Sequence, residues 1–252
     1  MLRGIYTASS AMMVEQTRLD VISNNLSNVN TVGFKRYDVA VQSFHDVLIE
    51  AQGVSPKGAY RHPIGVLGMG ADEVISYTSF AAGALRHTGN SLDVAISGEG
   101  FFVVQTPEGE RYTRDGSFRI GPSSELVTSA GHPVLGENGP IILRGNRIDI
   151  DAQGVVYVDG RQVDKLRIVD FAAREGLRKQ NSQYFESTES SGAAIPAENY
   201  VVSQEHLEQS NVEIVREMVN MINATRSYEM NQRMILSQDD ALSKAVNDVG
   251  HI

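Results

Sequence analysis

The sequence predicts a mixed α and β protein, in which N- and C-terminal helices pair as a coiled coil around an inserted, mainly antiparallel β domain. Apolar residues recur at a 3–4 spacing near both ends of the 252-residue chain, as in helices that pack along a seam. Between the ends, short β-type runs alternate with turns rich in glycine, proline and aspartate. Short strands with regular turns are typical of an antiparallel sandwich or barrel.

These patterns divide the chain into four segments. Residues 1–35 are expected to form the N-terminal helix of the coiled-coil domain, and residues 205–252 its C-terminal helix. Residues 81–204 form the β-rich central domain. Residues 36–80 contain repeated glycines and prolines, which predict an extended linker or a loose hairpin.

The C-terminal helix carries the most regular pattern, because every seventh residue from Ile214 to Val249 is apolar. Ser210 and Glu213 match a capping box at its start, and Gly250 is placed for a C-terminal cap. The predicted assembly seam of both helices comprises Ile5, Met12, Leu19, Ile22, Leu26, Val29, Ile214, Met218, Met221, Tyr228, Ile235, Leu242 and Val249.

Further apolar residues lie off this seam and would stay exposed on a single helix pair: Val212, Val215, Val219, Ile222, Met230, Met234 and Ala245. A helix that is apolar on more than one stripe is suited to being surrounded. We therefore expect the terminal helices to pack fully only against other copies or related chains.

The N-terminal helix is expected to end within Ser23–Lys35, read SNNLSNVNTVGFK. Asparagine tolerates left-handed backbone and favours caps and turns, and Gly33 is the expected residue at positive φ. Within the β domain, Leu92, Val94 and Ile96 alternate with other residues, and Phe101–Val104 predicts a buried strand.

Composition excludes several classes of function. A net charge of −9 argues against nucleic acid as a partner. The sequence contains no run of 18 apolar residues, so no membrane insertion is expected. The sequence contains no cysteine, which excludes disulfides and thiolate metal sites. Charged residues within residues 1–30 interrupt any apolar core of a signal peptide, so no cleaved signal peptide is expected. We expect no enzyme, no catalytic residue, no cofactor and no tight metal site, since the histidines lack ligand spacing: His45, His62, His87, His132, His206 and His251.

Three blocks in chain order resemble the bacterial flagellar basal-body rod family. They are SNNLSNVNTVGFK (23–35), NSLDVAISGEGFFVV with YTRDGSF and LVTSAGHPVLG (within 90–136), and LEQSNVEIVREMVNMINATRSYEMN (207–231). In the first block, the residues that match the family's N-terminal motif are Asn24, Asn25, Leu26, Asn28, Val29, Asn30, Gly33 and Phe34.

This resemblance implies a structural subunit of the basal body that polymerises into the axial drive shaft and transmits torque to the hook. It also implies that the terminal helices line the inner wall of a tube. The implied partners are other copies, related rod proteins and the flagellar export apparatus, which would deliver the chain without a cleaved signal peptide.

Residues 106–113 and 139–141 look more like the proximal-rod (FlgF-type) branch, whereas the C-terminal block is close to the distal-rod (FlgG-type) branch. The proximal branch is the preferred interpretation and the distal branch its alternative. Outside the family, a secreted β-domain adhesin on a coiled-coil stalk would explain the same pattern.

Overall fold

The computed structural model describes residues 2–43, 47–55, 58–68, 70–181 and 183–249. They form two compact units. The helix–hairpin unit consists of residues 1–24, 37–77 and 214–252, and the β unit of residues 25–36 and 78–213. The predicted fold class is confirmed, because terminal helices in contact with each other flank an antiparallel, β-rich middle region.

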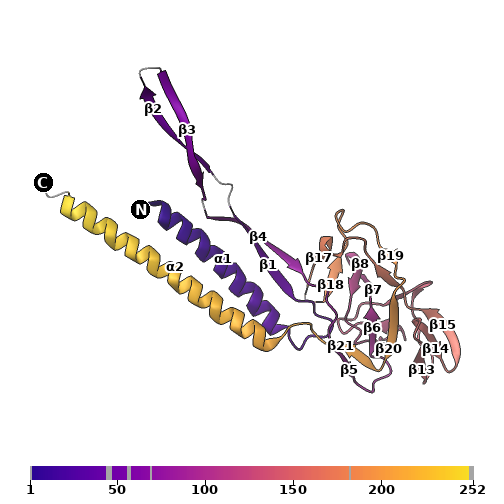
Figure 1. Cartoon of the computed structure of the whole chain (residues 1–252). Coiled ribbons are helices and arrows are strands. Elements are labelled where there is room, and N and C mark those ends of the chain that lie inside the picture. The colour runs from indigo at the N-terminus through magenta and orange to yellow at the C-terminus, as the bar shows by residue number, and fades with distance from the viewer. Residues whose placement is uncertain (1, 44–46, 56–57, 69, 182, 250–252) are drawn as a thin grey trace. The chain divides into compact units, whose positions relative to one another are not determined.

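The helix–hairpin unit contains α1 (Leu2–Ser27) and α2 (Ile214–Val249), which lie side by side in Figure 1. Gly4 near the start of α1 meets the side chain of Gln238 near the end of α2. The two helices are therefore antiparallel, as the heptad patterns at both ends predict. Among the described residues, no helix is long and apolar enough to cross a membrane.

The start of α2 differs from the prediction. The helix begins at Ile214, so Ser210 and Glu213 do not form the expected capping box. Ser210 Oγ instead accepts a hydrogen bond from the backbone N–H of Val212 at 3.3 Å. The preceding residues cannot be helical, because His206–Glu208 pair as strand β21 with β5 (Leu85–His87). Gly250, the expected C-terminal cap, lies outside the described residues.

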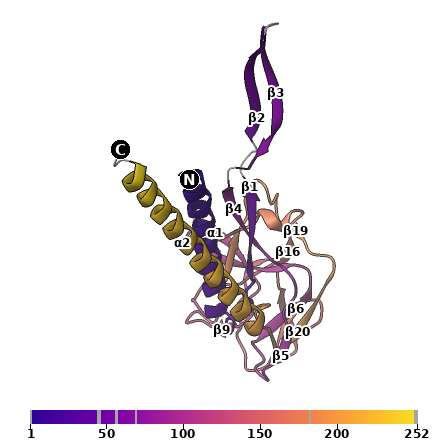
Figure 2. The same ribbon diagram turned by 60° about the vertical axis from the view of Figure 1, so that its left-hand side comes forward.

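The segment expected to be a linker or hairpin contains four strands, β1 (Tyr37–Ser43), β2 (Val47–Ser55), β3 (Gly58–Leu67) and β4 (Ala71–Thr78). β1 pairs with β4, and β2 pairs with β3 to form a long antiparallel hairpin, which Figure 2 shows beyond the β1–β4 ladder. The hairpin contains an irregularity where the register shifts between Ile49, opposite Gly65, and Glu50, opposite Pro63. Backbone pairing explains these long strands in a glycine-rich sequence, since ladder hydrogen bonds do not depend on side chains.

The β unit is built from several small antiparallel sheets. Its largest sheet has six strands in the order β17–β18–β8–β7–β16–β19, and a three-stranded sheet has the order β13–β14–β15. β6 pairs with β20, β5 with β21, β9 with β10 and β11 with β12. The bounds are β6 Val94–Gly98, β7 Phe101–Thr106, β8 Gly109–Thr113, β9 Arg119–Ile120, β10 Leu126–Val127, β11 Leu135–Gly136, β12 Gly139–Pro140, β13 Ile148–Ile150, β14 Val155–Val158, β15 Arg161–Lys165, β16 Ile168–Asp170, η1 Arg174–Gly176, β17 Arg178–Lys179, β18 Tyr184–Glu186, β19 Ile195–Pro196 and β20 Tyr200–Gln204.

Strand β7 lies at the centre of the hydrophobic core, as its sequence predicts. Phe102 and Val104 join the larger of two apolar clusters, and Phe101 and Val103 join the other. A strand buried on both faces needs a continuous apolar run rather than alternation. Strand β6 is buried on both faces as well, because Val94, Ala95 and Ile96 are all buried. The alternation of buried and exposed residues expected for this strand is therefore wrong.

Candidate functional site

Burial along α1 and α2 follows only part of the predicted seam. Met221, Tyr228, Ile235 and Leu242 are partly buried, whereas Ile214 and Met218 are 44% and 49% exposed. The row of less exposed residues on α2 is completed by Glu217, Ala224, Asn231 and Gln238, which continue the 3–4 spacing. On α1, Ile22 is buried and Ile5, Met12 and Leu19 are partly buried.

A second apolar stripe on α2 remains exposed, as predicted from residues off the seam. Large apolar side chains at Val215, Val219, Ile222, Met230 and Met234 are about half exposed or more, and Ala245 is exposed too. The expectation for Val212 was wrong, because Val212 precedes the helix and is buried in the β unit. Side chains of this size that stay exposed among the described residues are suited to contacts with other chains.

A buried ionic cluster in the β unit joins residues from three distant parts of the sequence. We call it the ionic clasp and define it as Lys35, Arg114 and Glu208, whose residues are 1%, 6% and 1% exposed. Lys35 Nζ lies 2.6 Å from Glu208 Oε1, and Arg114 Nη1 lies 3.4 Å from Glu208 Oε2. A buried charge is tolerated only when it is paired and hydrogen-bonded, and each member of the clasp has such partners.

Backbone groups satisfy most of the remaining polar atoms of the clasp. Lys35 Nζ donates to Ala81 O at 2.8 Å, and the Gly83 N–H donates to Glu208 Oε1 at 2.9 Å. Arg114 donates to Ile96 O at 3.2 Å and to Gly98 O at 2.8 Å. The clasp therefore holds the segment after α1, the strand before α2 and the centre of the β unit in one hydrogen-bonded network.

The electrostatics of the clasp are dominated by burial. Desolvation lowers the pKa of Lys35 and the pKa of Arg114, and the charge of Glu208 opposes both changes. Two cations share one carboxylate, and the Arg114 guanidinium also lies 5.3 Å from the centre of the Phe101 ring. Glu208 is thus the counter-charge on which both cations depend.

Gly33 permits the approach of the N-terminal motif to the clasp. It has φ +67°, which confirms the predicted left-handed backbone, and its N–H donates to Glu208 O at 2.8 Å. A Cβ at this position would lie 2.5 Å from the Arg114 carbonyl carbon and from the Asp115 nitrogen. Only glycine fits here without a backbone shift.

Other residues of the N-terminal motif also belong to this contact. Asn25 and Phe34 are buried, and Leu26, Asn28 and Val29 are partly buried, whereas Asn24 and Asn30 are exposed. Lys179 Nζ lies 3.6 Å from the centre of the Phe34 ring and donates to Lys35 O at 3.1 Å. Burial lowers the pKa of Lys179 to about 7.

Sequence reasoning did not identify the clasp, although all three of its residues lie in or beside the motifs quoted above. Lys35 and Glu208 are 173 residues apart, and Arg114 and Glu208 are 94 residues apart. No local period connects such positions. The sequence signal is limited to charged residues within otherwise apolar or turn-forming blocks.

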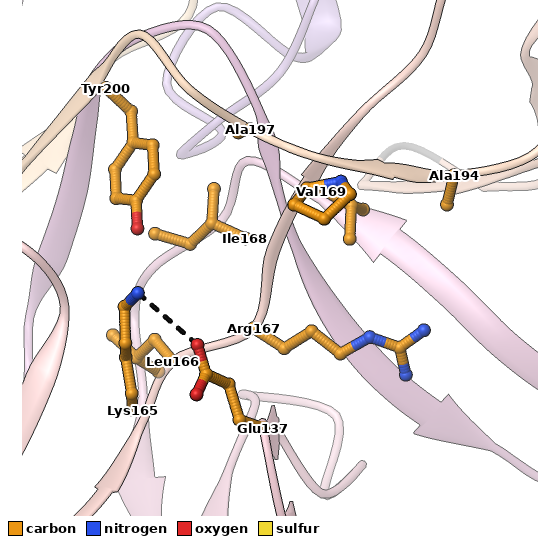
Figure 3. Close-up of a pocket in the computed structure, with 10 residues that line it drawn as sticks. Glu137, Lys165, Leu166, Arg167, Ile168, Val169, Ala194, Ala197 and Tyr200 are labelled. Atoms are coloured by element: carbon orange, nitrogen blue, oxygen red, sulfur yellow. Dashed lines mark ion pairs between the residues drawn. The ribbon is translucent and has the colours of Figure 1, made fainter.

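A cavity of about 300 Å³ lies beside β16 and β19 in the β unit (Figure 3). Figure 3 shows the Tyr200 hydroxyl directed toward Lys165, whose Nζ lies 3.3 Å from Glu137 Oε1. Arg167 on the other side is paired with Glu110 at 2.9 Å. Both cations at this cavity are neutralised by carboxylates, so the cavity presents no free charge for a ligand.

The Gly98-Glu99-Gly100 sequence serves backbone packing rather than ligand binding. Gly98 and Gly100 have φ values of +104° and +116°, and a Cβ at Gly98 would lie 2.5 Å from Asn199 O. In the described part of the chain, no group of three or more histidine, aspartate or glutamate side chains is placed to hold a metal ion.

Three family models match this chain. The model described as flagella basal body rod protein matches residues 5–35, the flagellar hook protein FlgE/F/G D1 domain matches residues 95–158, and the flagellar basal body rod FlgEFG protein C-terminal model matches residues 203–248. Each of these three ranges contains one member of the clasp: Lys35, Arg114 and Glu208, respectively.

Curated relatives align over nearly the whole chain. The flagellar basal-body rod protein FlgG of Borreliella burgdorferi is 37% identical over 268 residues, covering 98% of each chain. FlgG of Bacillus subtilis is 34% identical over 270 residues, covering 98% of this chain and 99% of the relative. FlgF of Rhizobium meliloti is 31% identical over 253 residues, covering 99% of each chain. This chain therefore belongs to the FlgE/F/G family of flagellar basal-body rod proteins, and it is a non-enzymatic structural protein of the rod.

Proposed function

We propose that this chain polymerises with other rod subunits through the exposed stripe of α2, and that it occupies the proximal, FlgF-type position of the rod. The observation that carries the first part is the row of large apolar side chains that α2 leaves uncovered. Ile222 is 51% exposed and lies in the middle of this row. Covering such side chains contributes about 25 cal/mol per Å² of apolar surface.

In this proposal, the partners are other copies of the chain and related rod proteins, and the flagellar export apparatus delivers the subunit. The predicted seam then has two roles. Met221, Tyr228, Ile235 and Leu242 join α2 to α1 within the subunit, whereas Ile214 and Met218 extend the surface offered to neighbouring subunits. Membership of the rod family implies assembly with other rod components.

The assembly surface is tested with Ile222→Asp and a matched control, Asn223→Asp, which places the same charge on the adjacent exposed position of α2. We expect Ile222→Asp to abolish swimming and rod assembly, because a carboxylate is strongly disfavoured in a desolvated contact. The control should swim, and both purified proteins should melt like the wild type. Normal motility of the Ile222→Asp strain would remove the stripe from the assembly surface.

The proximal assignment is supported by residues 106–113 and 139–141, which look more like the FlgF-type branch. Length does not separate the two branches, because the alignment with FlgF of Rhizobium meliloti covers 253 positions and the alignments with FlgG cover 256 to 270. FlgG is the second candidate, because the FlgG relatives have the higher identities, 34% and 37% against 31%.

Complementation separates the two positions. We expect this gene to restore swimming to a strain of its own species that lacks its FlgF function and not to one that lacks FlgG. Rescue of the FlgG-deficient strain alone would assign the chain to the distal rod. Labelling the subunit and locating the label in isolated basal bodies gives the same answer without a swimming assay.

A further inference from the structure

We propose that His87 and His206 form an open, two-histidine site for a divalent transition-metal ion of the imidazole-preferring class, with Zn²⁺ as the representative. The sequence places these histidines 119 positions apart, yet β5 and β21 pair them directly, His206 opposite His87. Their ring centres are 5.0 Å apart, with the planes tilted by 55°. Both side chains are accessible to solvent.

The backbone hydrogen bonds between β5 and β21 show that His87 and His206 form a non-hydrogen-bonded cross-strand pair. The Thr88 N–H donates to Glu205 O at 2.7 Å, and the Gln209 N–H donates to Ala84 O at 2.8 Å. Hydrogen-bonded and non-hydrogen-bonded pairs alternate along an antiparallel ladder. The His87–His206 pair is therefore non-hydrogen-bonded, which is the position where opposite side chains approach most closely, with Cα atoms about 4.5 Å apart.

The tautomer of His206 is suited to metal binding. His206 Nδ1 lies 2.7 Å from Gln204 O. A carbonyl oxygen only accepts hydrogen bonds, so Nδ1 carries the proton and Nε2 of the neutral ring keeps its lone pair. Metal-binding histidines commonly donate their other ring N–H to a backbone carbonyl, which fixes the ring and raises its basicity.

The donor set selects the class of metal. Neutral imidazole nitrogens favour Zn²⁺, Cu²⁺ and Ni²⁺, whereas Mg²⁺ and Ca²⁺ prefer oxygen ligands. Zn–N bonds of about 2.0–2.1 Å place two ligating nitrogens of a tetrahedral site about 3.3 Å apart. With the ring centres 5.0 Å apart and the His206 ring held by Gln204 O, rotation of the His87 ring toward His206 Nε2 brings the two nitrogens to that separation.

Because only two protein ligands are present among the described residues, water completes the coordination and the ion exchanges readily. This site differs from the tight, chelator-resistant site that the sequence argues against. A metal bound here connects β5 to β21, and β21 also carries Glu208 of the clasp. Binding to the native state alone raises its stability by mass action.

The test uses the full chain after treatment with a chelator, titrated with ZnCl₂ by calorimetry and by NMR of the histidine rings. We expect one Zn²⁺ per chain at this pair, shifts of the ring protons of both His87 and His206, and a higher melting temperature. His87→Phe keeps an aromatic cross-strand partner for His206 and should weaken binding at least tenfold. His132→Gln, which alters a histidine packed on Tyr184, should bind as the wild type does.

The NMR readout needs no variant, so it stands even if a substitution impairs folding. Zn²⁺ shifts confined to other histidines, or unchanged affinity in His87→Phe, would overturn the proposal. An absence of saturable binding by the wild-type chain would also overturn it. A melting temperature that depends on His87 but not on Zn²⁺ would assign the pair to aromatic packing alone.

Discussion

Replacing Glu208 with glutamine tests whether the ionic clasp stabilises the β unit. Glutamine keeps the size of the side chain and can still accept a hydrogen bond from Gly83, but it removes the counter-charge of Lys35 and Arg114. Removing one partner of a buried ion pair costs about 3–5 kcal/mol, and the retained amide places Glu208→Gln near the lower end. At about 2–4 °C per kcal/mol for a unit of this size, we expect the melting temperature to fall by roughly 6–12 °C.

The assay is thermal unfolding of the purified chain followed by circular dichroism in the β region, with Glu189→Gln as a matched control on an exposed loop residue. The control should melt within about 1 °C of the wild type, since exposed charges contribute little. Adding Lys35→Met to Glu208→Gln should cost less than the sum of the two single changes, because the residues share one network. A wild-type melting temperature for Glu208→Gln would refute the reasoning, and strict additivity would show that Lys35 and Glu208 act separately.

Two further predictions concern the N-terminal motif. Gly33→Ala should destabilise the β unit by about 1–3 kcal/mol more than Gly131→Ala. Gly131 is a matched control because it also has positive φ but has open space around it. Equal losses of unfolding free energy in denaturant would show that the backbone near Arg114 adapts to the added methyl group. Burial lowers the pKa of Lys179 to about 7, so as the pH rises Lys179 loses its proton in the native state before it does so in the unfolded chain. The free energy of unfolding should therefore increase between about pH 7 and pH 10. Lys179→Met should remove that rise, and a constant difference in melting temperature between variant and wild type at pH 6.5 and pH 9 would contradict it.

The clasp joins the three ranges of this chain that the family models match. Each block contributes one charged residue to a single buried network, and the network lies where the chain leaves α1 and where it approaches α2. Loss of Glu208 leaves Lys35 and Arg114 buried without the carboxylate that both of them contact.

The sequence by itself determined the features that depend on local period and local backbone chemistry. Heptad spacing at both ends predicted α1, α2 and their antiparallel contact, and the apolar run at Phe101–Val104 predicted the doubly buried strand β7. The asparagine-rich turn predicted the left-handed Gly33. These features are readable because side-chain periodicity and φ preferences act over a few residues.

Tertiary structure alone decided the features that need partners distant in sequence. His206–Glu208 form a strand because Leu85–His87 are available to pair with them, and this pairing delays the start of α2 to Ile214. The same pairing brings His87 to His206 and helps to place Glu208 beside Lys35 and Arg114. Hydrogen bonding and charge pairing across more than 90 residues leave no periodic trace in the sequence, so only the folded chain reveals which polar groups satisfy one another.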